Sequence, residues 1–383
     1  MFPSRLASVL GGGAGLPNNY SLDFDGTDDY INVGNTSNFV TAGQARTVSL
    51  WTKLLNGSAS NDYYITLGNM TGTRTWFALR QNTDYLVFSD NETNTNLTTT
   101  NANMLDSWKH VALTYDGSTT VKVYVDGSLD TSITTGGTLA TDQGADVIIG
   151  ARNSSSSADG TTVGQYINAN IDEVAIWNTA LSAGDISALY QAKGTSDLND
   201  DGNSANLQGW WRMGDGTLDD FNLIADQVNP TLGSDVLSGI GDFSSWGGSG
   251  NDTIPTGWAQ DGTASETNRF IESSGALRFL CDGNTLNLKK ESALTVGTTY
   301  KITLDVTAYS SGDVKSSGSG GDNWGIDATG SYTQYFTASS TTFYIQRISS
   351  SDITIDNLIV KPVNGNPGIM TSMAAEDIVT DTP

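Results

Sequence analysis

The sequence predicts an all-β protein built from two β-sandwich domains, with a short N-terminal arm and a C-terminal tail. Its 383 residues correspond to about two domains of ordinary size. Aspartates outnumber glutamates by 36 to 6. Because Asp favours turns and caps while Glu favours helices, this ratio indicates many loops and few helices. Short segments with alternating apolar residues recur along the chain, as is typical of β-sandwiches.

The first domain is predicted at residues 17–234, after an arm of residues 1–16. Its best strand candidates combine β-branched and aromatic residues with a period of two, at 47–51, 76–79, 85–88, 110–115 and 121–125. Asp-Gly pairs at 116–117 and 126–127 stand where hairpin turns are needed. One helix is expected at 181–193, because Ser182 and Asp185 have the spacing of a capping box ahead of an apolar stripe.

The second domain is predicted at residues 235–363, and a tail follows at 364–383. Its strand candidates lie at 276–280, 299–309, 342–348 and 353–363. The Ser- and Gly-rich stretch 310–322 between two of them is expected to be a long exposed loop. The tail is too short and too mixed in composition for a domain. We therefore expect the arm and the tail to be appendages that other subunits hold in place; the alternative is that both ends fold back on their own sandwich.

The formal net charge of −24 argues against binding to nucleic acids or to anionic membrane surfaces. No stretch reaches the roughly 18 apolar residues of a membrane span, so membrane insertion is not expected. Cys281 is the only cysteine, which rules out an intrachain disulfide and a thiolate metal cluster. The N-terminal stretch has a very short apolar run and matches a signal peptide poorly, so we expect folding in a cytoplasm.

Several motifs of the first domain follow one another in a recognisable order. They are SLDFDGTDDYINV, TVSLWTK, DSWKHVALTYDGSTTVKVYVDGSLD, VIIGARN, INANIDEVAIWNTALSAGDISALY and LQGWWRMGDG. In this order they resemble the laminin-G-like, concanavalin A-like jelly-roll sandwiches, over about residues 17–215. The resemblance implies a jelly roll, but this fold serves lectins, adhesion modules and glucanases alike, so it leaves the function open.

Two further resemblances concern the rest of the chain. The segments GDFSSW, IPTGWAQD and ITIDNLIVKPV resemble those of galactose-binding-like jelly rolls in carbohydrate-binding modules. The final segment NPGIMTSMAAEDIVTDTP is similar to the ends of virion proteins from tailed phages of marine bacteria. The second of these implies a virion protein, which agrees with the poor signal peptide and the single cysteine.

No catalytic constellation is expected. Glucanases need two carboxylates that flank the sugar bond, and the nearest pair is Asp172 and Glu173. Neighbouring residues of a regular strand point to opposite faces, so this pair should not act together, and a structural role for Asp172 is favoured. His110, the only histidine, lies in an alternating strand and is interpreted as a packed residue. The chain is therefore predicted not to be an enzyme.

Calcium is the cofactor that the aspartates suggest. Asp197, Asn199 and Asp201 have the spacing of the first half of a Ca²⁺ loop, with Gly202 in the sixth position. The twelfth position is Gln208 rather than Glu, so an Asx-rich turn without an ion is the favoured interpretation.

Two more calcium sites are implied only by the resemblances. Laminin-G-like domains often hold Ca²⁺ at the rim of the sandwich, which here would involve Asp25, Asp28 or Asp172. The galactose-binding-like resemblance implies a structural Ca²⁺ between Asp242 and Asp356.

Sugar binding normally uses exposed aromatic rings with polar neighbours. Trp324 and Tyr332 are the best candidates, because they lie in a Gly-rich stretch that should be exposed. Packing at the core or rim is the alternative for Trp324. Trp51, Trp177 and Trp258 are expected to be buried.

The predicted function is that of a non-enzymatic structural protein on the surface of a phage virion, as a capsid decoration, fibre or tail component. Its expected partners are other virion proteins or copies of itself, with host surface glycans as a further ligand. The alternative is a secreted bacterial protein that binds carbohydrate or mediates adhesion outside the cell.

Overall fold

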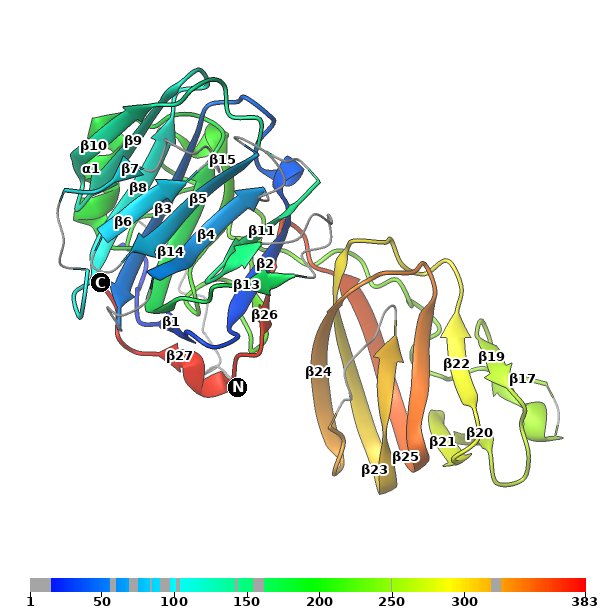
Figure 1. Cartoon of the computed structure of the whole chain (residues 1–383). Coiled ribbons are helices and arrows are strands. Elements are labelled where there is room, and N and C mark those ends of the chain that lie inside the picture. The colour runs from blue at the N-terminus through cyan, green and yellow to red at the C-terminus, as the bar shows by residue number, and fades with distance from the viewer. Residues whose placement is uncertain are drawn as a thin grey trace. The chain divides into compact units, whose positions relative to one another are not determined.

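The computed structural model describes residues 15–55, 60–68, 75–82, 85–89, 97–100, 104–141, 144–153, 162–248, 250–317 and 325–383. Apart from one α-helix and short 3-10 turns, the regular structure of these residues is β-strand, which confirms the all-β class (Figure 1). None of the helices within these ranges is long and apolar enough to cross a membrane. The chain forms two compact units, residues 1–230 with 365–383, and residues 231–364.

The first unit is a sandwich of two antiparallel eight-stranded sheets. One sheet contains β1 (Ser21–Asp25), β3 (Arg46–Leu54), β8 (Lys109–Tyr115), β9 (Thr120–Val125), β10 (Ser128–Thr134), β14 (Asn168–Trp177), β15 (Leu207–Trp211) and β27 (Ile378–Val379). The other contains β2 (Tyr30–Asn35), β4 (Ser60–Gly68), β5 (Trp76–Asn82), β6 (Tyr85–Ser89), β7 (Leu97–Thr98), β11 (Asp146–Ile149), β16 (Leu223–Ile224) and β26 (Gly368–Thr371). A two-stranded pair, β12 (Arg152–Asn153) and β13 (Val163–Gly164), stands beside them.

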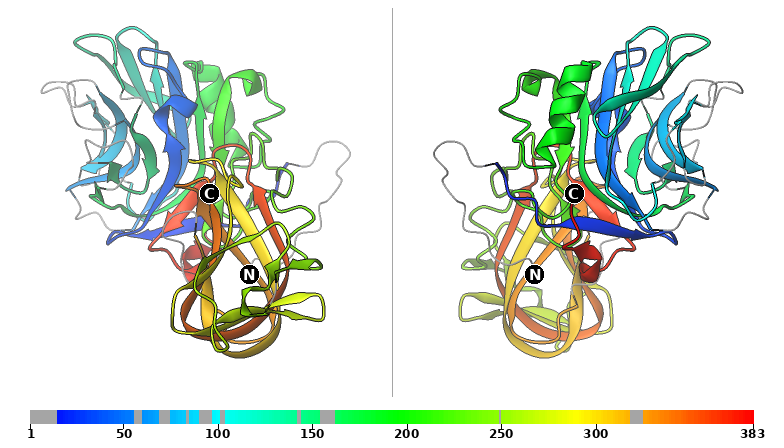
Figure 2. Two further views of the ribbon diagram at one scale, coloured as in Figure 1. Left: turned by 90° about the vertical axis from the view of Figure 1, so that its right-hand side faces the viewer. Right: turned by 90° about the vertical axis from the view of Figure 1, so that its left-hand side faces the viewer.

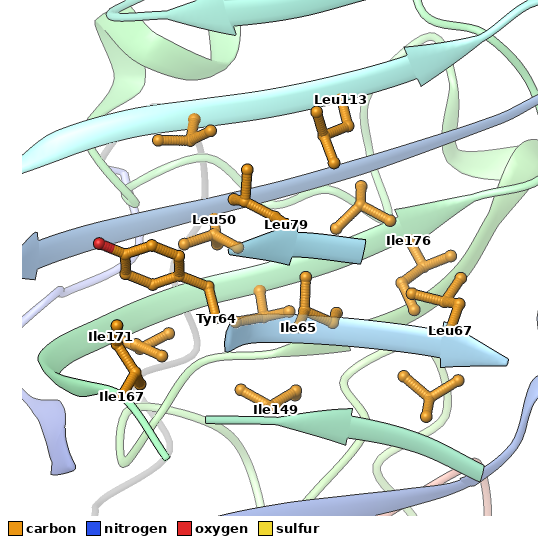
Figure 3. Close-up of a cluster of buried hydrophobic side chains, with 14 of the residues drawn as sticks. Leu50, Tyr64, Ile65, Leu67, Leu79, Leu113, Ile149, Ile167, Ile171 and Ile176 are labelled. Atoms are coloured by element: carbon orange, nitrogen blue, oxygen red, sulfur yellow. The ribbon is translucent and has the colours of Figure 1, made fainter. Parts of the chain in front are cut away.

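The core of this unit lies between the two sheets, because each strand turns alternate side chains inward. Leu50 and Ile176 from one sheet meet Ile65, Leu79 and Ile149 from the other (Figure 3). All five are at most 1% exposed. The alternation that the sequence shows in these segments thus reflects burial against the opposite sheet.

The single helix, α1 (Ala183–Ala192), forms where the sequence predicts it. The hydroxyl of Ser182 accepts the backbone N–H of Asp185, and the carboxylate of Asp185 accepts the backbone N–H of Ser182, which completes the capping box. Ile186 is its fully buried residue. It packs with Trp177 and Trp210 in a small second core on the outer face of the β14 sheet, where Figure 2 shows the helix.

The predicted C-terminal tail is part of the first sandwich rather than an appendage. Strand β26 pairs with β2 and β16 in one sheet, and β27 pairs with β1 in the other. Met370 and Met373 are 6% and 9% exposed and belong to the core between the sheets. The expectation of a tail held by other subunits differs from this structure, because these apolar residues are buried in their own domain.

Asp381 fixes the end of this segment to the first sandwich. Its carboxylate accepts hydrogen bonds from Lys53 Nζ at 2.7 Å and from Trp108 Nε1 at 2.9 Å. Its carbonyl accepts the hydroxyl of Ser21 at 2.6 Å. The short 3-10 turn Ala375–Asp377 lies directly before β27 and begins the return to β1. The arm predicted at residues 1–16 lies outside the described residues except for residues 15 and 16.

The second unit contains seven strands in one hydrogen-bonded network and a short two-stranded pair. The network comprises β19 (Ala259–Gly262), β20 (Arg269–Ser273), β21 (Ala276–Asp282), β22 (Leu286–Lys290), β23 (Thr299–Ser317), β24 (Gly330–Thr337) and β25 (Phe343–Pro362). The pair is β17 (Trp246–Gly247) and β18 (Ile254–Pro255). Trp258 and Cys281, at 6% and 3% exposed, lie in its core, which confirms the burial expected for Trp258.

Part of the predicted loop 310–322 is strand. Strand β23 continues to Ser317 and pairs with β25 as far as Tyr344. Val314 is fully buried there and Ser316 is 3% exposed. Alternate residues of this polar stretch therefore point inward, as in a regular strand. Likewise β25 is one long strand where the sequence suggests two, at 342–348 and 353–363.

The second unit is inserted into the first, because the chain leaves the first unit after Pro230 and returns to it at Gly365. Inside the second unit its two ends are neighbours: the backbone N–H of Asn364 donates to the Thr231 carbonyl at 2.9 Å. The predicted boundaries at 234/235 and 363/364 are close to these points. The sequence does not indicate that residues 365–383, which follow the second unit, complete the first unit.

Removal of residues 366–383 should therefore destabilise the first unit selectively. The truncation deletes one strand from each sheet and two buried methionines, each worth about 1.5–3 kcal/mol of burial. In differential scanning calorimetry we expect the transition of the first unit to be lost or to fall steeply in temperature. The transition of the second unit should stay unchanged. A truncated chain whose two transitions both match those of the full chain would contradict this interpretation.

Candidate functional site

A β-bulge in β14 brings two adjacent carboxylates into the interior of the first unit. The pairing of β14 with β3 shifts register between Asp172 and Ala175. Glu173 has a φ of 49°, in the left-handed region that non-glycine residues rarely adopt. Asp172 is fully buried and Glu173 is 8% exposed. The regular alternation assumed for this pair from the sequence does not hold here, because the bulge interrupts it.

Glu173 forms a buried ion pair with Arg212. Arg212 Nε donates to Glu173 Oε1 at 2.8 Å, and Trp210 Nε1 donates to Oε2 at 2.6 Å. The guanidinium also donates from Nη2 to the carbonyls of Pro17 and Gly194, at 2.7 and 3.1 Å. Both oxygens of the carboxylate are therefore engaged. The pair joins β14 to the segment before β1 and to the residues that follow α1.

Asp215 holds the same segment from the other side. Its Oδ2 accepts the backbone N–H groups of Asn19 and Tyr20, at 2.5 and 2.8 Å. Leu16 donates its backbone N–H to the Thr195 carbonyl at 2.7 Å. Residues 15–20, which we call the N-terminal strap, are thus fixed along the buried acids. The sequence offers no periodic signal for this strap.

Burial raises the pKa of both carboxylic acids. Asp172 Oδ1 accepts the backbone N–H of Glu173 at 2.7 Å, and no described residue forms a hydrogen bond with its Oδ2. Burial, and next the charge of Glu173, raise the pKa of Asp172 well above its ordinary value. Burial also raises the pKa of Glu173, but the charge of Arg212 and the hydrogen bond from Trp210 act against it. These two donors stabilise the charged form of Glu173, and Asp172 has no such donors among the described residues.

The only histidine is packed, as the sequence predicts. His110 is 1% exposed, and its Nε2 lies 2.8 Å from Ser49 Oγ. A small pocket beneath α1 is lined by both residues, together with Trp51, Trp177 and Glu173. Burial lowers the pKa of His110 to about 4, and no described residue forms a hydrogen bond with Nδ1. A serine–histidine pair without a carboxylate that orients the imidazole lacks the third part of a triad.

Three carboxylates gather at the turn between β1 and β2. Oxygen atoms of Asp25, Asp28 and Asp29 lie within 4.8 Å of one another. Asp29, which the sequence analysis misses, is 3% exposed, and its Oδ2 accepts the backbone N–H of Asp25 at 3.0 Å. Burial, together with the smaller effect of the charges of Asp25, Asp377 and Asp28, raises the pKa of Asp29 to about 6 against that hydrogen bond. Asp172 is not a member of this cluster, because it lies beside Glu173 in the interior.

The loop with calcium-like spacing is built from Asx turns. Asp197 Oδ1 accepts the backbone N–H of Asn199 at 3.0 Å, and Asp201 Oδ1 accepts that of Asn203 at 2.6 Å. The side-chain amide of Asn199 donates to the Gln227 carbonyl at 2.9 Å. These contacts are those of the turn that the sequence favours over an ion site.

The candidate residues of the second unit are only partly brought together. The backbone N–H of Leu358 donates to the Gly241 carbonyl at 2.9 Å, so the segments that carry Asp242 and Asp356 are neighbours. Each carboxylate accepts a nearby backbone N–H, Asp242 from Ser244 and Asp356 from Asn357.

Tyr332 is not an exposed platform. It pairs with Leu304, a core residue, and packs against the core of the second unit. Its hydroxyl donates to the Ala328 carbonyl at 2.9 Å, which anchors the preceding turn. The prediction of an exposed ring differs from this placement because Tyr332 occupies an inward position of β24. Trp324, the other predicted sugar-binding residue, lies outside the described residues.

Residues 25–187 match the family model described as the concanavalin A-like lectin/glucanases superfamily. This segment therefore carries a domain of that kind, which confirms the resemblance of the first domain. The match covers less than half of the chain and ends before the second unit. The galactose-binding-like resemblance of residues 235–363 and the phage resemblance of the final residues stay predictions. No curated protein sequence matches the chain.

Solved structures with a similar fold share little sequence with this chain. A protein from Bacteroides ovatus assigned to carbohydrate binding has 19% identity and a TM-score of 0.42, over 55% of this chain and 56% of its own length. The chain thus spans little more than half of that protein. Domain 4 of an extracellular arabinanase from Geobacillus stearothermophilus, solved with arabinotriose, has 20% identity and a TM-score of 0.35, over 47% and 82%. A heptameric pentraxin from Limulus polyphemus has 15% identity and a TM-score of 0.33, over 45% and 82%.

Replacement of Asp172 by Asn should stabilise the protein as the pH rises. The raised pKa means that folding favours the protonated acid, a contribution that is present at low pH and lost as the pH rises above about 4. Asn is neutral at every pH and keeps an oxygen for the Glu173 backbone N–H. Chemical unfolding from pH 4 to 8 should therefore show a growing advantage of Asp172→Asn over the wild type.

The matched control is Asp215→Asn, which weakens an ionised acceptor of two backbone N–H groups and should destabilise the fold. An Asp172→Asn protein that loses stability at neutral pH would show that Asp172 is ionised in the folded state.

Proposed function

We propose that this protein is a non-catalytic carbohydrate-binding protein that acts at a surface. The observation that carries the proposal is the match of residues 25–187 to the lectin/glucanase superfamily, combined with the burial of the acids on its closing strand. A lectin needs a binding surface, whereas a glucanase also needs two carboxylates open to the substrate. In β14 Asp172 is fully buried, and Glu173, which lines the small pocket beneath α1, has both carboxylate oxygens engaged by Arg212 and Trp210.

The contacts of these acids support a structural role. Glu173 has both oxygens bonded to Arg212 and Trp210, and Asp172 is fully buried. A general acid must reach the glycosidic oxygen, and a nucleophile must reach the anomeric carbon. His110 offers no alternative, because it is buried with a pKa lowered to about 4.

Two settings fit this chemistry, the surface of a phage virion and the outside of a bacterial cell. Binding to glycans would serve host attachment in the first and adhesion in the second. The virion role is supported by the resemblance of the final segment, although that segment completes the first sandwich. Mass spectrometry of purified phage particles would distinguish the two, because only a virion protein is present there in fixed stoichiometry.

Calcium would stabilise the fold at the turn between β1 and β2. Asp25, Asp28 and Asp29 supply the hard oxygen ligands that Ca²⁺ prefers. The pKa of Asp29 is raised mainly by burial and next by the charges of neighbouring aspartates, and a bound cation would offset both effects. The Asp197 loop and the Asp242–Asp356 pair are the further proposed sites, with fewer carboxylates each.

The proposed function is tested by measuring binding and hydrolysis on the same polysaccharides. With laminarin, agar and alginate, we expect the full chain to be retarded in affinity electrophoresis by at least one and to release no reducing sugar from any. Release of reducing sugar that disappears in a folded Asp172→Asn protein would show catalysis. No binding on these and on a broad glycan array would contradict a carbohydrate-binding role.

The calcium proposal predicts that millimolar Ca²⁺ raises the melting temperature relative to EDTA. A ligand that binds only the folded state adds about 2.7 kcal/mol at a hundredfold excess over its dissociation constant. The double variant Asp25→Asn/Asp28→Asn should lose most of this response, while Asp197→Asn should reduce it less, because the Asp197 loop has fewer carboxylates. Identical melting curves in Ca²⁺ and EDTA for the wild type would refute the proposal.

A further inference from the structure

An open face of the second unit carries two lysines side by side. Strand β23 pairs on one side with β24 and on the other with β25. Lys301 of β23 lies opposite Lys361 of β25 and opposite Tyr335 of β24. Their neighbours Ile302 and Val360 are fully buried, so the alternation of the strands turns the two half-buried lysines outward, beside Tyr335, which is only 9% exposed.

This arrangement costs stability unless something offsets it. Like charges directly opposite each other on paired strands repel. The ion pairs found among the described residues involve other side chains, so neither lysine is neutralised by a carboxylate there. Lys301 Nζ lies 5.4 Å from the centroid of the Tyr335 ring. This cation–π contact orients the ammonium group, but the tyrosine ring has no negative charge that would neutralise it.

The charge of the two units makes the lysine pair more unusual. The second unit has 14 acidic and 8 basic residues, a net charge of −6, while the first has 28 and 10, a net charge of −18. The chain has only 18 basic residues in all. Two of them adjacent and without a described acidic partner form a local positive patch in an acidic protein.

The next positions along the same face suit a sugar ring. Thr303 lies opposite Thr333 and opposite Ile359, and the side chain of Ile359 is 38% exposed. One step further, Asp305 accepts hydrogen bonds from Ser331 at 2.5 Å and from Asn357 at 2.9 Å, so its charge is already satisfied. Successive outward residues are about 7 Å apart along a strand, so one sugar ring can contact neighbouring outward side chains.

We propose that this face binds an acidic sugar residue, one that carries a carboxylate or a sulfate group. The anion lies between Lys301 and Lys361, and the apolar side of the ring contacts Ile359 between the threonines. The inference rests on the proposed carbohydrate-binding function and gives it a ligand class. It also accounts for the lysine pair, because a shared anion turns the repulsion into two attractive contacts.

The charge of the protein limits the ligand to one with sparse charges. Duplex DNA carries one charge per about 1.7 Å, and the net charge of −24 repels such a polymer at every other contact. At physiological ionic strength charges are screened beyond about 8 Å. A single anionic group between the lysines therefore experiences mainly those two cations.

The experiment uses the full chain and three probes: an alginate oligosaccharide, a sulfated agar-type oligosaccharide and a neutral laminarin oligosaccharide. We expect isothermal titration to show binding of at least one acidic probe, and the double variant Lys301→Gln/Lys361→Gln to weaken it by at least about tenfold. The variant Lys315→Gln, on the same strand but opposite Gln346, is the matched control and should bind like the wild type. Melting curves verify that both variants are folded.

The outcomes separate this inference from the proposed function. Neutral and acidic probes that bind equally well to the wild type and to the double variant would overturn the inference while carbohydrate binding stands. Binding of none of the probes, together with none on a glycan array, would overturn both. Duplex DNA that binds in competition with the acidic probe and is lost in the double variant would show a nucleic acid site instead.

Discussion

The buried ion pair between Glu173 and Arg212 is the contact on which the first unit depends. Burying two charges is costly, and removing one partner of such a pair typically destabilises a protein by about 3–5 kcal/mol. Here the cost is offset by donors and acceptors on every side: Trp210, the Pro17 carbonyl and the Gly194 carbonyl complete the network. Through these contacts one guanidinium joins a central strand, the N-terminal strap and the end of α1.

The same network ties the adjacent acids of β14 into the fold. The bulge at Glu173 turns its carboxylate toward Arg212, and burial raises the pKa of the adjacent Asp172. Glu173 thereby joins β14 to Arg212 and Trp210. The proposed recognition of an acidic sugar uses a different part of the chain, the outward residues of β23 and β25.

Local sequence patterns predict much of this structure, but not the contacts between segments that are far apart in sequence. Strands such as β3 and β8 are evident in the sequence because one sheet face is buried, and α1 is evident because its cap is local. The bulge at Glu173 has no local marker, since it depends on how β14 meets β3. Strands β26 and β27 are too short to show periodicity and gain their stability from partners far away in sequence: β2 and β1, each more than 300 residues away, and β16. Asp29 was missed because its burial results from the fold around the β1–β2 turn.

The distribution of the few cations connects fold and function. Arg46 is fully buried, with Phe77 and Tyr115 rings 5.7 and 5.5 Å from its guanidinium carbon, and Arg212 is buried beside Glu173. Arginine suits such buried positions, because its planar guanidinium group has several donors that can form hydrogen bonds with neighbouring acceptors. Lysines, as strongly hydrated point charges, stay near the surface. In a chain with more than twice as many acids as bases, a surface lysine has many carboxylates available as partners. A pair that instead faces outward together, with Ile359 one step along the sheet, combines charge and apolar contact in the way that recognition of an anionic sugar requires.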